Sequence, residues 1–359
     1  MRKITTTVAV AMAAGLAAGA IGPVAAQDAG SGTYTFTRLA SPTDDHELQF
    51  GGIAEVPSGV ITVVGGGGDT GYTWSSTDAG QTWTETTHEA YGIATLGDDF
   101  VTYWRTSPWD AAEGGSASSV IQTSADGVAW EEATTIAGAV VQDIFETDDG
   151  LALLGMDFRE FEGFSGPGGY PTLWTSSDAT TWEASEIAPP IYTRQDDPLG
   201  LIGIARSDDG AYLATGVENI FDQGEDGPPA KMFHVYYSSD GVEWTRATSP
   251  VPDTETGVWG TMTAPVWTGA GFLVNAVTAD EAAPHGLFLT ADGSSWEQVA
   301  DIPGPDIPTW VGDGSTTVGF RLPFSESDPP ELTEGAMVYA SSDGQTWEHP
   351  SPHVVEGGH

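Results

Sequence analysis

Short runs of β-branched, aromatic and other apolar residues, interrupted by Gly and Asp, fill most of the chain. Residues 140–146 and 151–156 form one such pair around the turn at 148–150, and similar pairs surround the turns at 208–210 and 313–314. Runs of this length bounded by turn residues are typical of β-hairpins. No segment has the long 3.6-residue period of an amphipathic helix, so the pattern predicts an all-β protein.

A turn that follows these runs occurs six times. Each copy begins with Ser or Thr, has Asp two residues later and ends with Trp. The Asp/Trp pairs are Asp78/Trp83, Asp126/Trp130, Asp178/Trp182, Asp240/Trp244, Asp292/Trp296 and Asp343/Trp347. The carboxylate can accept hydrogen bonds from backbone N–H groups, Gly supplies a positive φ, and Trp covers the hairpin. We therefore expect these residues to be structural.

Successive Trp residues of the turn lie 47 to 62 residues apart. A period near 50 residues suits one sheet per repeat. The six copies predict a six-bladed β-propeller, with four antiparallel strands (A to D) in each blade and the repeated turn between strands C and D. We expect residues 27–350 to form this single domain and residues 351–359 to form a C-terminal tail. Residues 34–39 are expected to pair with the last blade and close the ring.

The pattern Ser-x-Asp-x-Gly-x-Thr-Trp is complete at residues 76–83 and one residue shorter in the other five copies. It resembles the Asp-box (BNR) repeat, which implies the fold of the sialidase-like superfamily. The resemblance implies no single activity, because Asp-boxes occur in sialidases, other glycoside hydrolases, sortilin-type receptors and photosystem assembly factors. Sialidases are expected to carry an Arg-Ile-Pro-type segment in the first blade, whereas residues 48–56 contain no Arg. The chain departs from the sialidase catalytic signature.

The N-terminus has the order of a secretory signal peptide. Arg2 and Lys3 precede an Ala/Gly/Val-rich stretch at 8–22, and the small residues 24–26 follow. Cleavage after residue 26 is expected, which predicts a secreted protein. A retained membrane anchor is the alternative, although the stretch is short for a bilayer span. No later segment is long and apolar enough to cross a membrane, so no membrane insertion is expected.

The chain is strongly acidic, with 52 Asp and Glu against 10 Lys and Arg and a net charge of −42. Without residues 1–26, eight basic and 52 acidic residues would give −44. Such a surface repels phosphate backbones, so no nucleic-acid partner is expected. The bias suits a salty medium that screens self-repulsion, or an acidic exported protein from an ordinary habitat. There is no Cys, which excludes disulfides and thiol chemistry. We expect a monomer.

Long connections between strands B and C carry the candidate functional residues. They are expected to gather around the mouth of the central channel, where long loops on a rigid scaffold usually bind ligands. Aromatic rings beside Arg and carboxylates can stack on sugars and bond their hydroxyl groups. The predicted ligand-binding residues are Arg105, Trp109, Arg159, Tyr170, Arg194 and Arg321. The candidate catalytic carboxylates are Asp110, Asp157, Glu160 and Glu218. Aligning the ends of strand B places Arg105, Asp157, Glu218 and Arg321 at equivalent rim positions.

Three functions remain open. The preferred interpretation is a non-enzymatic binding or scaffold propeller whose rim holds a glycan or a surface protein. The runner-up is a glycoside hydrolase that uses two rim carboxylates as acid and base or nucleophile. The third is an extracytoplasmic assembly factor that binds a protein partner. No cofactor is expected. The pairs Asp148/Asp149 and Asp208/Asp209 are weighed as Ca²⁺ ligands, although Asp-Gly is ordinary turn chemistry.

Overall fold

The structure is a computed structural model of residues 1–359, and it describes only part of the chain. The described segments are residues 8–10, 24–28, 34–38, 49–67, 70–106, 117–159, 168–188, 200–220, 230–255, 260–278, 286–300, 309–312, 317–321, 337–341, 344–347 and 353–355. All regular elements within these segments are β-strands, so the predicted all-β class is confirmed. The described residues include no helix that is long and apolar enough to cross a membrane.

The strands form seven sheets. The first three repeats give β4 (Gln49–Glu55), β5 (Ile61–Gly67), β6 (Thr70–Ser76) and β7 (Thr84–Thr87); β8 (Gly92–Leu96), β9 (Asp99–Thr106), β10 (Ser118–Ser124) and β11 (Glu131–Ala137); and β12 (Ala139–Thr147), β13 (Gly150–Arg159), β14 (Gly168–Ser176) and β15 (Glu183–Glu186). The next two give β16 (Gly200–Arg206), β17 (Tyr212–Ile220), β18 (Ala230–Ser238) and β19 (Thr245–Ala247); and β20 (Gly260–Met262), β21 (Val266–Trp267), β22 (Phe272–Thr278), β23 (Gly286–Thr290) and β24 (Glu297–Ala300). The sixth gives β25 (Thr309–Gly312), β26 (Thr317–Arg321) and β27 (Met337–Ser341).

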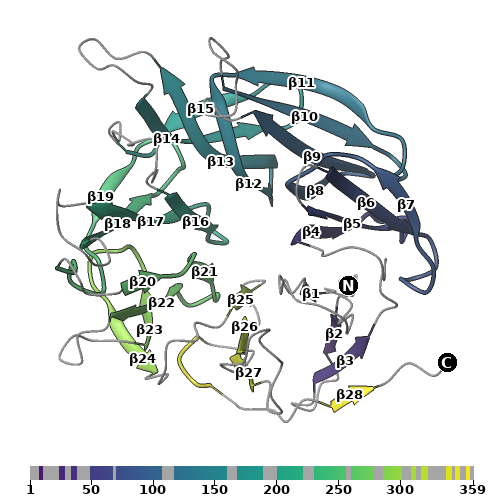
Figure 1. Ribbon diagram of the computed structural model, residues 1–359. Helices are drawn as coiled ribbons and strands as arrows, with labels where there is room; N and C mark the ends of the chain where they lie inside the picture. Colours follow the sequence, from purple (N-terminus) through teal and green to yellow (C-terminus); the bar gives the residue numbers. More distant parts are fainter. Residues whose placement is uncertain are drawn as a thin grey trace.

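Each repeat folds as one antiparallel sheet whose strands follow each other in chain order, except that β20 and β21 of the fifth repeat both pair with β22. Figure 1 shows the sheets arranged radially around a common centre, with the first strand of a repeat innermost and the last outermost. This is the architecture of a β-propeller. It places the ends of the second strands and the starts of the third strands on one face of the ring and the repeated Asp turns on the other.

A seventh sheet stands between the last repeat and the first, so the predicted count of six blades is not confirmed. It contains β1 (Val8–Val10), β2 (Val24–Asp28), β3 (Tyr34–Arg38) and β28 (His353–Val355). Strand β3 pairs with β2 antiparallel and with β28 parallel, rather than with the last repeat. A short connection from β2 favours this hairpin. Strand β28 falls within the predicted tail, whereas signal cleavage after residue 26 stays a prediction.

Neighbouring sheets pack face to face, and the alternation of each strand decides which neighbour a side chain meets. In β13, Leu151 and Leu153 pack with Tyr103 of the second repeat, and we call this interface the 2–3 seam. Ala152 and Leu154 point the other way and pack with Tyr236 of the fourth repeat, at the 3–4 seam. This alternation follows from the two-residue period of a strand.

The repeated turns are held by their Asp carboxylates. Oδ1 of Asp126 accepts hydrogen bonds from the N–H groups of Val128 and Ala129, both at 2.9 Å. The same two bonds recur at Asp178 and Asp240, and they are the main cause that lowers the pKa of these carboxyls. A positive φ follows each Asp, at Gly127 (70°), Ala179 (58°), Gly241 (77°) and Gly293 (72°).

The turns also join neighbouring sheets, because those of the second and fifth repeats form hydrogen bonds with the preceding repeat. The carbonyl of Gly127 accepts a hydrogen bond of 2.8 Å from Ser75 Oγ in the first sheet. The carbonyl of Gly293 accepts one of 2.9 Å from Thr248 Oγ1. Indole rings contribute as well: Trp130 stacks on His88 with a centroid distance of 4.7 Å. The turns are therefore part of the contacts between sheets.

The Trp residues that end the turns differ from the expectation that each one covers its own hairpin. All six are half-buried rather than enclosed in a core: Trp83, Trp130, Trp182, Trp244, Trp296 and Trp347. The last five pack against the buried apolar residues at the seam with the preceding repeat, as Trp182 does at the 2–3 seam and Trp244 at the 3–4 seam. An indole is too large for so short a turn to bury, so the neighbouring sheet supplies the rest of the contact.

The indole N–H groups of these Trp residues bond either to their own turn or to the preceding repeat. Nε1 of Trp182 and Nε1 of Trp244 each donate a hydrogen bond of 3.1 Å to a carbonyl of their own turn. Nε1 of Trp296 instead donates one of 2.8 Å to the carbonyl of Thr248, in the fourth repeat. The predicted structural role of the Trp residues thus includes the joining of sheets, which the repeat pattern did not indicate.

Candidate functional site

The register of the strands corrects the predicted alignment of rim residues. Asp157 pairs with Tyr170 and Glu218 pairs with Met232, so both carboxylates lie in strands rather than in loops. Positions along each second strand can be counted from the residue that pairs with the first Ser of the following turn. In this count Asp157 and Glu218 occupy the same position. Arg105 lies one residue earlier, because its reference residue is Phe100.

Arg321 lies two residues earlier than Asp157 by the same count, because Thr317 pairs with Ser341. The predicted equivalence therefore holds for Asp157 and Glu218 only. The predicted alignment was wrong because the second strands differ in length. Only their pairing with the third strands shows how far each residue lies from the turn.

The two candidate carboxylates face different seams. Asp157 lies on the face of β13 that carries Leu151 and Leu153, which pack in the 2–3 seam. Glu218 lies on the face of β17 that carries Ala214, which packs in the 3–4 seam. The structure does not bring them together as an acid–base pair, because both face the preceding sheet and not each other.

Other candidates share the 2–3 seam. Arg105 lies on the same face of β9 as Tyr103, which packs in that seam. Tyr170 pairs with Asp157, so it lies on the same face of the third sheet as Asp157. Trp109, Asp110, Glu160, Arg194 and the turn residue Asp343 lie outside the described residues. Arg159 and Arg321 end strands β13 and β26, and only their backbone is described.

Arg105 is held by a ring and a carbonyl rather than by a carboxylate. Its Nη1 donates a hydrogen bond to the carbonyl of Val141 across the 2–3 seam. Its Cζ lies 4.9 Å from the centre of the Tyr91 ring, a cation–π distance. Tyr91 is 45% exposed, and its ring is 6.3 Å from that of Tyr103. No ion pair of Arg105 is found among the described residues.

Asp143 of the third repeat lies near this group, because its charge acts on Tyr103, although it pairs with Leu154, whose side chain packs at the 3–4 seam. It follows a β-bulge in β12, where Gln142 is the extra residue and its carbonyl accepts a hydrogen bond from the Tyr103 hydroxyl. Asp143 keeps more than a third of its surface in contact with solvent, yet surrounding protein atoms raise its pKa to about 6. Burial, and then the charge of Asp143, raise the pKa of Tyr103.

The 3–4 seam contains a second polar group. Nε2 of His234 lies 3.0 Å from Oε2 of Glu218, and Nδ1 of His234 lies 3.4 Å from the Tyr236 hydroxyl. The His234 and Tyr236 rings are nearly parallel, with centroids 6.2 Å apart. The His234 side chain is 7% exposed and that of Glu218 is 35% exposed. Burial lowers the pKa of His234 although Glu218 raises it.

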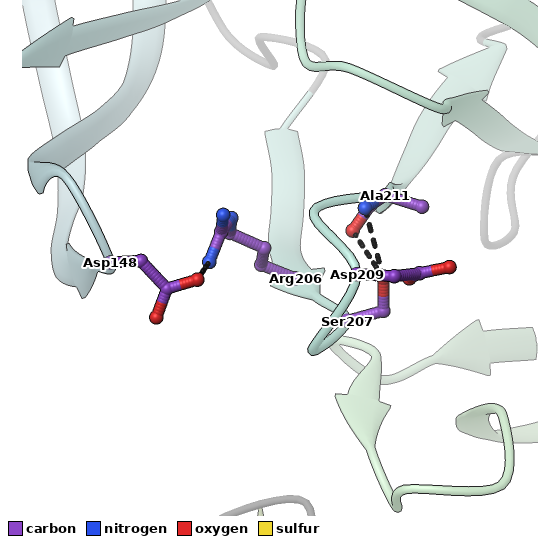
Figure 2. A network of polar contacts seen from close by, with 5 residues as sticks. All are labelled: Asp148, Arg206, Ser207, Asp209 and Ala211. Atoms are coloured by element: carbon purple, nitrogen blue, oxygen red, sulfur yellow. Dashed lines mark hydrogen bonds and ion pairs between the residues drawn. The ribbon is translucent and has the colours of Figure 1, made fainter.

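Two of the four carboxylates weighed as Ca²⁺ ligands, Asp148 and Asp209, make contacts within the protein. Figure 2 shows Asp148, from the turn between β12 and β13, reaching Arg206 at the end of β16. Their Oδ2 and Nη1 atoms are 2.7 Å apart, and Asp209 accepts a hydrogen bond from Ser207. Among the described residues, no three His, Asp or Glu side chains lie close enough to hold a metal ion.

Solved structures share this fold at low sequence identity. A protein from Lactobacillus plantarum matches with a TM-score of 0.56 and 14% identity, over 94% of this chain and 93% of its own. YCF48 from Cyanidioschyzon merolae matches with a TM-score of 0.50 and 15% identity, over 86% and 87%. The chain has a β-propeller fold. An α-L-arabinanase from Penicillium chrysogenum, solved with arabinobiose, matches this propeller with a TM-score of 0.47 and 15% identity, over 81% and 92%. No protein-family model and no curated protein matches the sequence.

Sequence reasoning missed five residues of these groups: Tyr91, Tyr103, Asp143, His234 and Tyr236. One signal was available, because His234 and Tyr236 alternate on the strand that precedes the fourth turn and therefore share a face. The contacts between Arg105 and Val141 and between Tyr103 and Gln142 join separate repeats, and no local pattern predicts them.

Proposed function

We propose that the chain is an exported Asp-box propeller that binds a glycan at the 2–3 seam. The observation that carries this proposal is the environment of Arg105. In a chain with 52 acidic and 10 basic residues, its guanidinium lies on an exposed Tyr91 ring and bonds a carbonyl. Its charge is not neutralised by any described carboxylate, and the remaining N–H donors suit the oxygens of a ligand.

The neighbouring groups fit a sugar. Tyr91 offers an amphipathic ring at a partly open surface, and aromatic rings of this kind pack against sugars. Asp143 offers a carboxyl that can accept or donate a hydrogen bond near pH 6, because its pKa is about 6. Asp157 and Tyr170 face the same seam by register. The proposed site therefore combines the cation of Arg105, the ring of Tyr91 and the carboxyl of Asp157 at the 2–3 seam, with Asp143 close by.

A glycan array followed by calorimetry tests the proposal. Arg105→Gln and Tyr91→Ala should each lower the affinity for the glycan that the wild-type protein binds by at least about tenfold. The first removes a charge-assisted hydrogen bond and the second removes a ring contact. Arg246→Gln removes the same charge from the outer strand β19 and should leave affinity unchanged. The proposal fails if wild-type protein binds no glycan, binds only a protein partner, or is weakened equally by the Arg246 variant.

One observation favours glycoside hydrolysis as the second candidate. A carboxyl with a pKa near 6, such as that of Asp143, is suited to protonate a leaving group. Turnover of chromogenic glycosides by wild-type protein, abolished by Asp143→Asn, would establish hydrolysis in place of simple binding. Unchanged turnover in that variant would remove Asp143 from the role.

Export is also part of the proposal and has its own test. N-terminal sequencing of the protein recovered from the culture medium should begin at Gln27. A start at Met1, or recovery in the membrane fraction, would contradict it.

A further inference from the structure

We infer that the 3–4 seam holds a second binding site, in which Glu218, backed by His234 and Tyr236, receives a primary ammonium group. This site is separate from the one proposed at the 2–3 seam and does not depend on it. Its three residues come from β17 and β18 of the fourth repeat, on the face that meets the third.

The hydrogen-bond chain has one consistent direction. The partly exposed carboxylate of Glu218 accepts a hydrogen bond from Nε2–H of His234. Nδ1 then carries no proton and accepts from the Tyr236 hydroxyl. Burial lowers the pKa of His234, which favours the neutral imidazole, so the ring does not offset the charge of the carboxylate beside it.

The same chain holds Glu218 in place. Its Oε2 is bound to a buried ring, and that ring stacks on Tyr236. A carboxylate fixed before binding loses little conformational entropy when a ligand arrives. Among the described residues no partner of Oε1 is found, which leaves one oxygen for the ligand.

The surroundings favour a cation. Across the seam, Met156 and Phe158 lie on the face of β13 that is directed toward the fourth repeat, and neither carries a charge. Lys231 lies on the opposite face of β18 from His234, with Phe233, which packs toward the fifth repeat. Arg246 is the one described cation whose charge acts on His234; it pairs with Tyr236 on the same face, but it lies on the outer strand and is exposed.

The geometry selects an ammonium group over a guanidinium. A guanidinium binds a carboxylate best through two parallel bonds, and His234 already occupies one of the two oxygens. An ammonium group is a compact point charge that bonds a single oxygen. It can also lie against an aromatic ring such as that of Phe158. Such a group is carried by an amino sugar or by a Lys side chain.

Calorimetry with three probes tests the inference: a tetramer of glucosamine, its fully N-acetylated counterpart and a tetralysine peptide. Glu218→Gln keeps the bond from His234 and removes the charge, so it should weaken binding of an amine probe at least tenfold. Glu243→Gln removes the same charge from the turn between β18 and β19, at the opposite end of the strands, and serves as the matched control. It should leave binding unchanged.

The outcomes separate the possibilities. Preference for the glucosamine tetramer identifies a sugar amine, and preference for tetralysine identifies a protein side chain; either supports the inference. Equal weakening by Glu218→Gln and Glu243→Gln would show that the overall negative charge alone attracts the probe, and would overturn it. Equal binding of the N-acetylated tetramer would overturn it as well.

Discussion

A single methyl group at Gly127 should separate the two roles of the repeated turn. The residue has a φ of 70°, and a Cβ there would lie 2.0 Å from Thr62 Oγ1 and 2.3 Å from Ser75 Oγ, both in the preceding sheet. Gly97, in the turn between β8 and β9, has a φ of 64° but nothing within 4 Å of an added Cβ. Gly97→Ala therefore carries the backbone strain without the clash.

The cost of each change can be estimated from these contacts. An Ala in the left-handed region costs about 1 kcal/mol at either site. At Gly127 the clash adds about 1–3 kcal/mol, as overpacking does in a closed core. Displacing the carbonyl also weakens the hydrogen bond from Ser75, worth about 1 kcal/mol. Gly127→Ala should thus lower the free energy of unfolding by about 3–5 kcal/mol and Gly97→Ala by about 1 kcal/mol.

Urea unfolding, followed by tryptophan fluorescence, measures the difference. Thr62→Ala and Ser75→Ala remove the two atoms that the new methyl group meets. Gly127→Ala should therefore lower the free energy of unfolding less in a protein that already carries these two changes than in the wild-type protein. The reasoning is refuted if Gly127→Ala and Gly97→Ala cost the same within about 0.5 kcal/mol, because the turn would then make no close contact with the preceding sheet.

Three further predictions concern pH. Asp143 has its pKa raised from 3.8 to about 6, so the folded protein should lose stability as pH rises across that interval; Asp143→Asn should abolish this loss in unfolding measured at several pH values. The hydrogen bond from the Thr82 hydroxyl is the largest cause that lowers the pKa of Asp78 from 3.8 to about 2, so Thr82→Ala should raise the pKa that NMR measures for this carboxyl. The stability that the ionised Asp78 contributes is present above pH 3.8 and should be lost as pH falls from 3.8 to about 2. Burial of His88 against Trp130 lowers its pKa from 6.5 to about 4; stability should fall as pH drops from 6.5 toward 4, and the His88 ring signals should stay unchanged until pH nears 4.

The elements were predictable where local chemistry decides them. The sequence around Asp148–Gly150 predicted strands at 140–146 and 151–156, and the structure has β12 and β13 there, each slightly longer. The turn at Asp126 was predictable because its hydrogen bonds reach only two and three residues ahead. Both features depend on neighbours in the chain, which a single sequence displays directly.

The candidate site was less predictable, because contacts between repeats define it. Arg105 was singled out, but its partner Val141 lies 36 residues away and is a backbone carbonyl that any residue type supplies. The bulge at Gln142 has no distinctive residue pattern. Glu218 was placed in a loop because an alternating strand was not expected beyond residue 217, and His234 went unnoticed without the pairing of β17 and β18.

The docking of a turn on the preceding sheet, as at Gly127 and Gly293, has a consequence for how such a chain can change in length. A repeat contains its own turn together with the groove, such as Thr62 and Ser75, that receives the turn of the next repeat. Duplicating or deleting one repeat as a unit keeps every turn matched to a groove, whereas a break inside a repeat leaves one turn and one groove without a counterpart. Whole repeats of about 50 residues are therefore the steps by which such a ring can grow or shrink with its packing intact.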